Sequence, residues 1–153
     1  MNELRAVSYL SAEHAAGLRA LSREPDFAPA AGASVALSPE HAADYIATTT
    51  KAREEGRSYV FVLTKGTEVL GVCRLIGILG VPRLIVAIGG AYRGQGNGSF
   101  LVRHVLKFAF DNLHLERVTA GGACLSLVSR FGRLEGNGIT REDWQGARAK
   151  SAP

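Results

Sequence analysis

The chain has 153 residues, of which 46% are hydrophobic and 21% are charged, with 18 glycines and five prolines. This length favours one domain with a single core, and the composition excludes a disordered or collagen-like chain. The net charge is +4, but residues 1–50 carry −3, from three basic and six acidic side chains, and the remaining residues carry +7. An anionic ligand would therefore favour the later residues and a cationic ligand the earlier ones.

The cysteines and the apolar stretches bear on the compartment. Cys73 and Cys124 both lie in apolar surroundings and form no Cys-x-x-Cys pair, so they do not indicate a disulfide framework. The first residues lack the basic-then-apolar order of a signal peptide. The most hydrophobic stretch, residues 69–91, contains two arginines and a proline, which favours successive strands over a membrane span. We expect a cytoplasmic protein with no membrane partner and, without a Lys/Arg run, no nucleic-acid partner.

The first third of the chain predicts one strand and two helices. Residues 4–10 are a candidate strand, and Ser11 follows as a candidate N-cap of a helix that reaches about residue 23. Residues 24–37 contain several turn formers and indicate a loop. Ser38-Pro39-Glu40 gives a stronger helix start, because it combines a capping hydroxyl, a proline at the first helical position and an acid near the positive end of the dipole. This helix should run to about Glu55 and end at Gly56.

From residue 57 the pattern changes to that of strands. Residues 59–63 and 69–78 are apolar around a Lys65-Gly66-Thr67 turn, which predicts a hairpin, and residues 83–88 form a third strand. From Gly98 apolar residues recur at helical spacing as far as Leu113. A short strand at 117–120, a short helix at 124–131 and a strand that begins at 132–135 complete one α/β domain over residues 1–153.

A glycine-rich segment, residues 92–99, lies between the third of these strands and the best-defined helix. Gly94, Gly96 and Gly98 let the backbone approach a ligand, and the helix N-terminus supplies unpaired N–H groups. The segment is not a P-loop, because no Gly-Lys-Ser/Thr occurs, and Ser99 breaks the dinucleotide-binding spacing. It predicts a phosphate-binding cradle; the alternative is a tight loop whose glycines serve turning alone.

Here the sequence resembles a known family. Arg93-x-x-Gly96-x-Gly98 resembles the Arg/Gln-x-x-Gly-x-Gly/Ala signature with which the GNAT acetyltransferases bind the pyrophosphate of acetyl-CoA. Further segments are similar to the RimJ/RimL-like branch, which acetylates ribosomal-protein N-termini. They are residues 24–26, 55–75, 85–98 and 108–120, and residues 130–136 with Arg133 where phenylalanine is usual. The resemblance covers about residues 3–136.

The resemblance implies a GNAT fold, with a mixed, mostly antiparallel sheet flanked by helices and with strands four and five splayed. Residues 1–56 would form the acceptor-side helices, 57–136 the sheet and acetyl-CoA-binding core, and 137–153 a short divergent C-terminus. The Gly89-Gly90 pair permits a β-bulge and close backbone approach. The residues that would bind acetyl-CoA are Ile88, Arg93, Gly94, Gln95, Gly96, Asn97, Gly98 and Ser99.

For catalysis, the N–H near Ile88 would bind the thioester oxygen while the amine attacks directly, without a covalent enzyme intermediate. The family's asparagine and serine before its second cofactor helix are here Gly121 and Cys124, and its proton-donating tyrosine is Val128. The Cys124 thiol could donate this proton, or could be a small buried hydrophobic group. Glu135 could relay the proton of the amine, or could be an exposed strand-end carboxylate.

The acceptor is expected to be a primary amine, with a protein or peptide N-terminus as the leading interpretation. The alternatives are a small amine, such as a polyamine or an aminoglycoside, and a non-catalytic acyl-CoA-binding module. Because 17 residues follow Gly136, the seventh strand should be short or missing, and we expect a homodimer with residues 137–148 near the interface and Ile139 and Trp144 as contacts. No metal is expected, since no two histidines share i,i+4 spacing and no cysteine set lies near His14, His41, His104 or His114.

Overall fold

The computed structural model describes residues 3–25, 27, 32 and 38–151. Seven strands form one mixed sheet in the order β1-β2-β3-β4-β5-β7-β6. Every neighbouring pair is antiparallel except β4 and β5, which are parallel. The predicted mixed, mostly antiparallel sheet is confirmed. The strands are β1 (Leu4–Val7), β2 (Tyr59–Lys65), β3 (Glu68–Ile76), β4 (Arg83–Ile88), β5 (Arg117–Thr119), β6 (Leu134–Glu135) and β7 (Gly138–Thr140).

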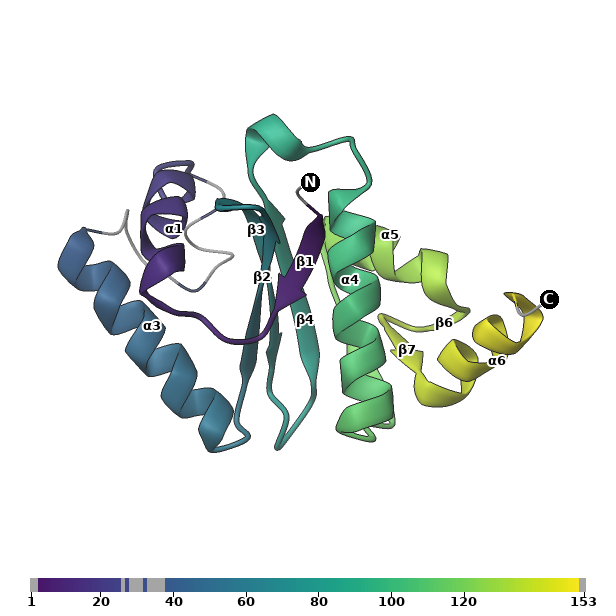
Figure 1. Ribbon diagram of the computed structural model, residues 1–153. Helices are drawn as coiled ribbons and strands as arrows, with labels where there is room; N and C mark the ends of the chain where they lie inside the picture. Colours follow the sequence, from purple (N-terminus) through teal and green to yellow (C-terminus); the bar gives the residue numbers. More distant parts are fainter. Residues whose placement is uncertain (1–2, 26, 28–31, 33–37, 152–153) are drawn as a thin grey trace.

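Helices cover both faces of this sheet (Figure 1). On one face lie α1 (Ala15–Leu21), which follows a 3₁₀ turn at Ala12–His14, and α3 (Pro39–Glu54). On the other lie α4 (Asn97–Lys107), which continues as a π-helical turn at Phe108–Asn112, and α5 (Gly122–Val128). Helix α6 (Arg141–Ser151) packs beside β7 near the C-terminal end.

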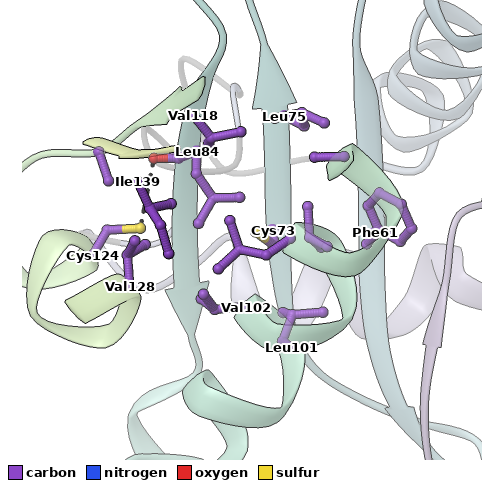
Figure 2. Packing of buried hydrophobic residues seen from close by; sticks show 14 of the residues in the cluster. Phe61, Cys73, Leu75, Leu84, Leu101, Val102, Val118, Cys124, Val128 and Ile139 are labelled. Atoms are coloured by element: carbon purple, nitrogen blue, oxygen red, sulfur yellow. Dashed lines mark hydrogen bonds between the residues drawn. The ribbon is translucent and has the colours of Figure 1, made fainter. Parts of the chain in front are cut away.

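The alternation of side chains along β2 explains the two layers. Phe61 and Leu63 point into the larger apolar cluster, which includes α4, α5 and β5, whereas Val60 and Val62 point into the smaller cluster beneath α1. Successive side chains of a strand face opposite sides of the sheet, so a run of apolar residues marks a strand covered on both faces. The buried core side chains of the larger cluster are shown in Figure 2.

Local signals in the sequence fix several element boundaries. The Ser38 hydroxyl accepts a hydrogen bond from the His41 N–H at 3.1 Å, and Pro39 begins α3, as predicted. Strand β4 spans the predicted residues 83–88. The residues of the predicted loop 24–37 lie largely outside the described residues, apart from Glu24, Pro25, residue 27 and residue 32.

The Gly89-Gly90 pair, which would permit a β-bulge, does not form one. Gly89 continues the regular register, because its N–H donates to the Leu70 carbonyl at 2.8 Å, and the register shift of the sheet lies at Leu63/Thr64, between β2 and β3. The close approach that glycine also permits is present. A Cβ on Gly89 would lie 2.5 Å from Leu21 Cδ2, so a larger residue would displace this side chain of α1.

The C-terminal segment confirms one expectation and corrects another. The seventh strand is short, as expected, and it lies between β5 and β6. Ile139 and Trp144, expected as contacts with a second chain, are 0% and 3% exposed. The Trp144 ring packs 5.9 Å from that of Phe110 and 6.3 Å from that of Phe131. These two side chains therefore belong to the core of their own chain, and their assignment as contacts with a second chain is wrong.

Candidate active site

The open edge of β4 is the first component of the site. Strand β4 pairs with β3 along its whole length, but with β5 at a single position, Arg83 opposite Thr119. Because the Gly89 N–H faces β3 and the backbone groups of an antiparallel strand alternate in direction, the amides of Val86 and Ile88 face the other way, into the gap toward β5. The predicted splay of strands four and five is therefore present, and among the described residues β4 has no strand partner on that side beyond Arg83.

The glycine-rich loop forms the second component. Gly94 and Gly96 have φ of +73° and +83°, the left-handed conformation that glycine adopts without strain. A Cβ built on either residue would meet nothing within 4 Å, so their backbone faces open space. Gly96 is the N-cap of α4, which places the unpaired N–H groups of the first helical turn beside it. The loop presents a backbone surface suited to an anion.

Three polar side chains of this loop bind its own backbone. Arg93 Nε donates to the Ile88 carbonyl at 3.0 Å, and Asn97 Nδ2 donates to the Tyr92 carbonyl at 2.9 Å. Gln95 Nε2 donates to the Ala91 carbonyl at 3.3 Å. The side chains therefore fix the shape of the loop, whereas the glycines and the helix N-terminus offer the donors.

A cavity of about 590 Å³ runs between the open edge of β4 and this loop. Such a volume is typical of a site for a small molecule or cofactor. Of the eight residues predicted to bind the cofactor, all except Gln95 line the cavity. The other described residues that line it are Val86, Ala87, Tyr92, Leu127 and Arg130.

Arg130 is the residue of the cavity that sequence reasoning missed most clearly. It follows α5 in the chain, and its Nη1 donates to the Ser99 hydroxyl at 2.6 Å across the mouth of the cavity. With Arg93 it makes the described lining cationic, since that lining contains two arginines and no carboxylate. A signal for Arg130 was available, because it begins the segment 130–136 that resembles the family.

Cys124 lies beside this cavity and is not among its described lining residues. Its side chain is 8% exposed, and its Sγ donates to the Leu84 carbonyl at 3.6 Å. Burial raises the pKa of this thiol to about 11, although a hydrogen bond from the Val86 backbone and the charge of Arg83 act in the opposite direction. The thiol is therefore protonated at neutral pH, and its hydrogen points at β4.

Glu135 lies in a different part of the molecule. It is exposed on β6 and lines a separate hollow of about 620 Å³, together with Arg117 and Asp143. The structure therefore places Glu135 in a different hollow from Ile88 and the glycine-rich loop, and its relay of the amine proton stays a prediction.

A carboxylate from the opposite face of the sheet reaches the end of β4. Glu24, shortly after α1, accepts a hydrogen bond from the Gly90 N–H at 2.8 Å through its Oε1. Gly90 is two residues beyond Ile88, so this carboxylate stands near the open edge of the strand. Sequence reasoning matched residues 24–26 to the family branch but gave Glu24 no role, because its partner, Gly90, is remote in the sequence.

The described residues hold neither a metal-binding cluster nor a membrane-spanning helix. They contain no group of three or more His, Cys, Asp or Glu side chains that could hold a metal ion. Among the helices of the part of the chain that the structure describes, none is long and apolar enough to cross a bilayer.

A mixed sheet that splays at its one parallel pair, with an anion-binding loop and helix N-terminus at the splay, defines the acetyltransferase class of enzymes. The chain belongs to the GNAT acetyltransferases: the family model described as "Acetyltransferase (GNAT) domain" matches residues 4–123. No curated protein has significant sequence similarity to the chain.

Solved structures agree on the fold. The ribosomal-protein-S5-alanine acetyltransferase from Vibrio fischeri has a TM-score of 0.63 at 14% identity, over 78% of this chain and 69% of that one. RimL, a ribosomal-protein alpha-N acetyltransferase in complex with coenzyme A, has a TM-score of 0.65 at 13% identity, over 83% and 77%. The spermidine N-acetyltransferase from Vibrio cholerae, in complex with CoA and spermine, has a TM-score of 0.59 at 17% identity, over 78% and 69%. At these identities the likeness shows the shared fold.

Proposed function

We propose that the chain transfers an acetyl group from acetyl-CoA to the free N-terminus of a protein or peptide. The observation that carries the proposal is the cavity that joins the glycine-rich loop to the open edge of β4. Its glycines, its helix N-terminus and its two arginines suit the phosphates of CoA. The Ile88 N–H and the Val86 carbonyl, which face the gap, suit the amide groups of the pantetheine arm.

The mechanism follows from these positions. The Ile88 N–H, which faces the splay, donates to the thioester oxygen and stabilises the negative charge that develops there as the amine nitrogen attacks. The C–N bond forms, the amine nitrogen loses a proton, the C–S bond breaks, and the CoA thiolate leaves and takes up one proton, so that the products are the amide and free CoA. Because the reaction needs no covalent enzyme intermediate, the chief contribution of the protein is to hold the amine and the thioester together.

The acceptor end of the site is assigned to the α1 side of the sheet. Glu24, held by the Gly90 N–H at 2.8 Å, offers a carboxylate to an ammonium group beside the end of β4. This agrees with the −3 charge of residues 1–50. A polyamine is the second candidate acceptor, because the fold is also that of a spermidine acetyltransferase and a carboxylate suits any primary ammonium.

A thiol-release assay with acetyl-CoA tests the proposal. We expect turnover with peptides that carry a free N-terminus, and none with the same peptides after N-terminal blocking. Polyamines and aminoglycosides are assayed in parallel. Turnover with polyamines alone would select the second candidate, whereas tight binding of acetyl-CoA without turnover across the whole panel would contradict acetyl transfer.

A further inference from the structure

The gap between β4 and β5 has a closed inner end. The two strands meet at Arg83 and Thr119, where the Thr119 N–H and hydroxyl both donate to the Pro82 carbonyl at 2.9 Å. One residue later β5 has turned away, because the Ala120 N–H donates to the Asn137 carbonyl at 2.9 Å. The backbone of β4 is therefore without a strand partner on this side from Leu84 onward.

Cys124 fills the first part of this gap. Its Sγ donates to the Leu84 carbonyl at 3.6 Å and accepts from the Val86 backbone, so the side chain occupies the position in which a paired β5 would contact β4. Figure 2 shows the sulfur of Cys124 directed at β4, with Val128 of the same helix beside it. The cavity begins at Val86, the next residue of β4 whose backbone faces the gap. The Cys124 side chain thus lies just beyond the inner end of the cavity, behind Val86.

The direction of the bound cosubstrate follows from charge. The phosphate-binding groups lie at the outer end of the cavity, at residues 93–99 and Arg130. A chain that extends from there along the edge of β4 reaches Ile88 and then Val86, so its acyl end lies toward the inner end. Resting on the proposed function, we propose that Cys124 is a specificity-determining residue that forms the inner wall of the acyl subsite and limits the acyl group to acetyl.

The size of the effect can be bounded. One methylene group in a close-packed apolar pocket changes the specificity of an enzyme by about 10- to 200-fold. The lining that Cys124 supports is packed, since Leu84 and Val128 beside it are 1% and 0% exposed. Removal of the sulfur atom opens room next to the acyl group for an additional carbon, whereas a branched residue fills it.

The test is the ratio of kcat/KM for propionyl-CoA to that for acetyl-CoA, measured with one accepted amine. We expect Cys124→Ala to raise this ratio about tenfold. Cys124→Val should lower it relative to the wild-type chain. A loss of stability alone would lower kcat/KM for both acyl-CoA compounds and leave their ratio unchanged. The ratio therefore distinguishes a residue that limits the acyl group from one that only supports the fold.

Cys73→Ala is the matched control. Cys73 is 0% exposed in the same core cluster, and it lies on β3 opposite Val86, away from the gap. The same truncation there should leave the ratio at the wild-type value. An unchanged ratio in folded Cys124→Ala, or an equal change in Cys73→Ala, would overturn the inference.

The inference and the proposed function fail in different ways. If the wild-type chain binds acetyl-CoA but acetylates no amine in the panel, the ratio is read instead from the dissociation constants of acetyl-CoA and propionyl-CoA by calorimetry. The same tenfold shift in Cys124→Ala is then expected. A wild-type chain that binds neither compound would overturn both, whereas binding with an unshifted ratio would overturn the wall alone.

Discussion

The two faces of the sheet, covered by α4 and by α1, contribute different kinds of chemical group at the end of β4. On the α4 side the candidate site is mostly backbone: Gly94 and Gly96 hold left-handed conformations, and the first turn of α4 faces the cavity. On the α1 side the contribution is a side chain, the carboxylate of Glu24. Backbone recognition needs glycines at fixed spacing, so the pattern itself indicates the role, whereas the segment 24–26 resembles the family branch without indicating what Glu24 does.

The backbone nature of the α4 side is tested most severely by Gly96→Glu. A glutamate at φ +83° places a carboxylate at the helix N-terminus, where the CoA phosphates are proposed to bind. We expect the affinity for acetyl-CoA to fall by at least about 100-fold, as measured by calorimetry. Gly56→Glu is the control: Gly56 has φ +69° and equally open surroundings, but it follows α3, so binding should be retained. Equal affinity in folded Gly96→Glu would contradict the assignment of the loop.

The packing around Cys124 predicts that its thiol reacts slowly with alkylating agents. Because burial raises the pKa of Cys124 to about 11, its thiol is neutral across the physiological range, and alkylation proceeds through the thiolate. We expect iodoacetamide to modify the native chain at pH 8 about 100-fold more slowly than the denatured chain. The rate should rise about tenfold per pH unit until the thiol ionises. Fast labelling of Cys124 at pH 8, located by mass spectrometry, would show that the wall is open.

The α4 side also contributes a side chain, because Arg130 adds a charged donor to the backbone donors of the loop. Charge-assisted hydrogen bonds contribute about 1.5–3 kcal/mol, so Arg130→Ala should weaken acetyl-CoA binding by about 10- to 100-fold. Arg103→Ala removes the same charge one helical turn beyond Ser99, from a residue outside the described cavity lining, and should have little effect. If both variants lose the same affinity for acetyl-CoA, the loss reflects the net charge of the chain, and Arg130 makes no specific contact with acetyl-CoA.

The smallest effect is expected on the α1 side. Glu24→Gln removes the charge but keeps an oxygen that can accept from the Gly90 N–H. The KM for the amine should rise about threefold, with the KM for acetyl-CoA unchanged, because exposed charge pairs are worth less than about 1 kcal/mol. Glu13→Gln, at a side chain 79% exposed, is the control. An increase confined to the KM for acetyl-CoA would move Glu24 out of the acceptor site.

Local sequence patterns predicted those parts of the fold whose causes are local. The cap at Ser38, the proline after it and the spacing of apolar residues in α4 lie within a few residues of one another. Helix α6 was missed because Trp144 is the one large apolar residue in its sequence. A start signal was nevertheless present, since the Thr140 hydroxyl accepts from the Asp143 N–H at 3.1 Å, the Thr-x-x-Asp pattern of a helix N-terminus.

The remaining errors arose where a residue's role depends on distant partners. Ile139 and Trp144 were interpreted as an interface because Phe110 and Phe131, which cover Trp144, are remote in the sequence. The Gly89-Gly90 pair left a bulge and a close approach both open, and the structure has the close approach, of Leu21 from a separate helix. Arg130 entered the cavity from a segment 31 residues beyond Ser99. The loop residues themselves were predictable, because one continuous segment builds the loop.

The single pairing position between β4 and β5 also affects how the chain behaves in solution. An unpaired strand edge is a template for the strands of other molecules, and proteins limit this hazard by covering or shortening the edge. Here Cys124 covers the edge at Leu84 and Val86, and Arg93 occupies the Ile88 carbonyl. The part of the β4 edge that remains uncovered is too short to pair with a strand of another molecule. The same few side chains that shape the cavity thus protect the chain from self-association through its own sheet.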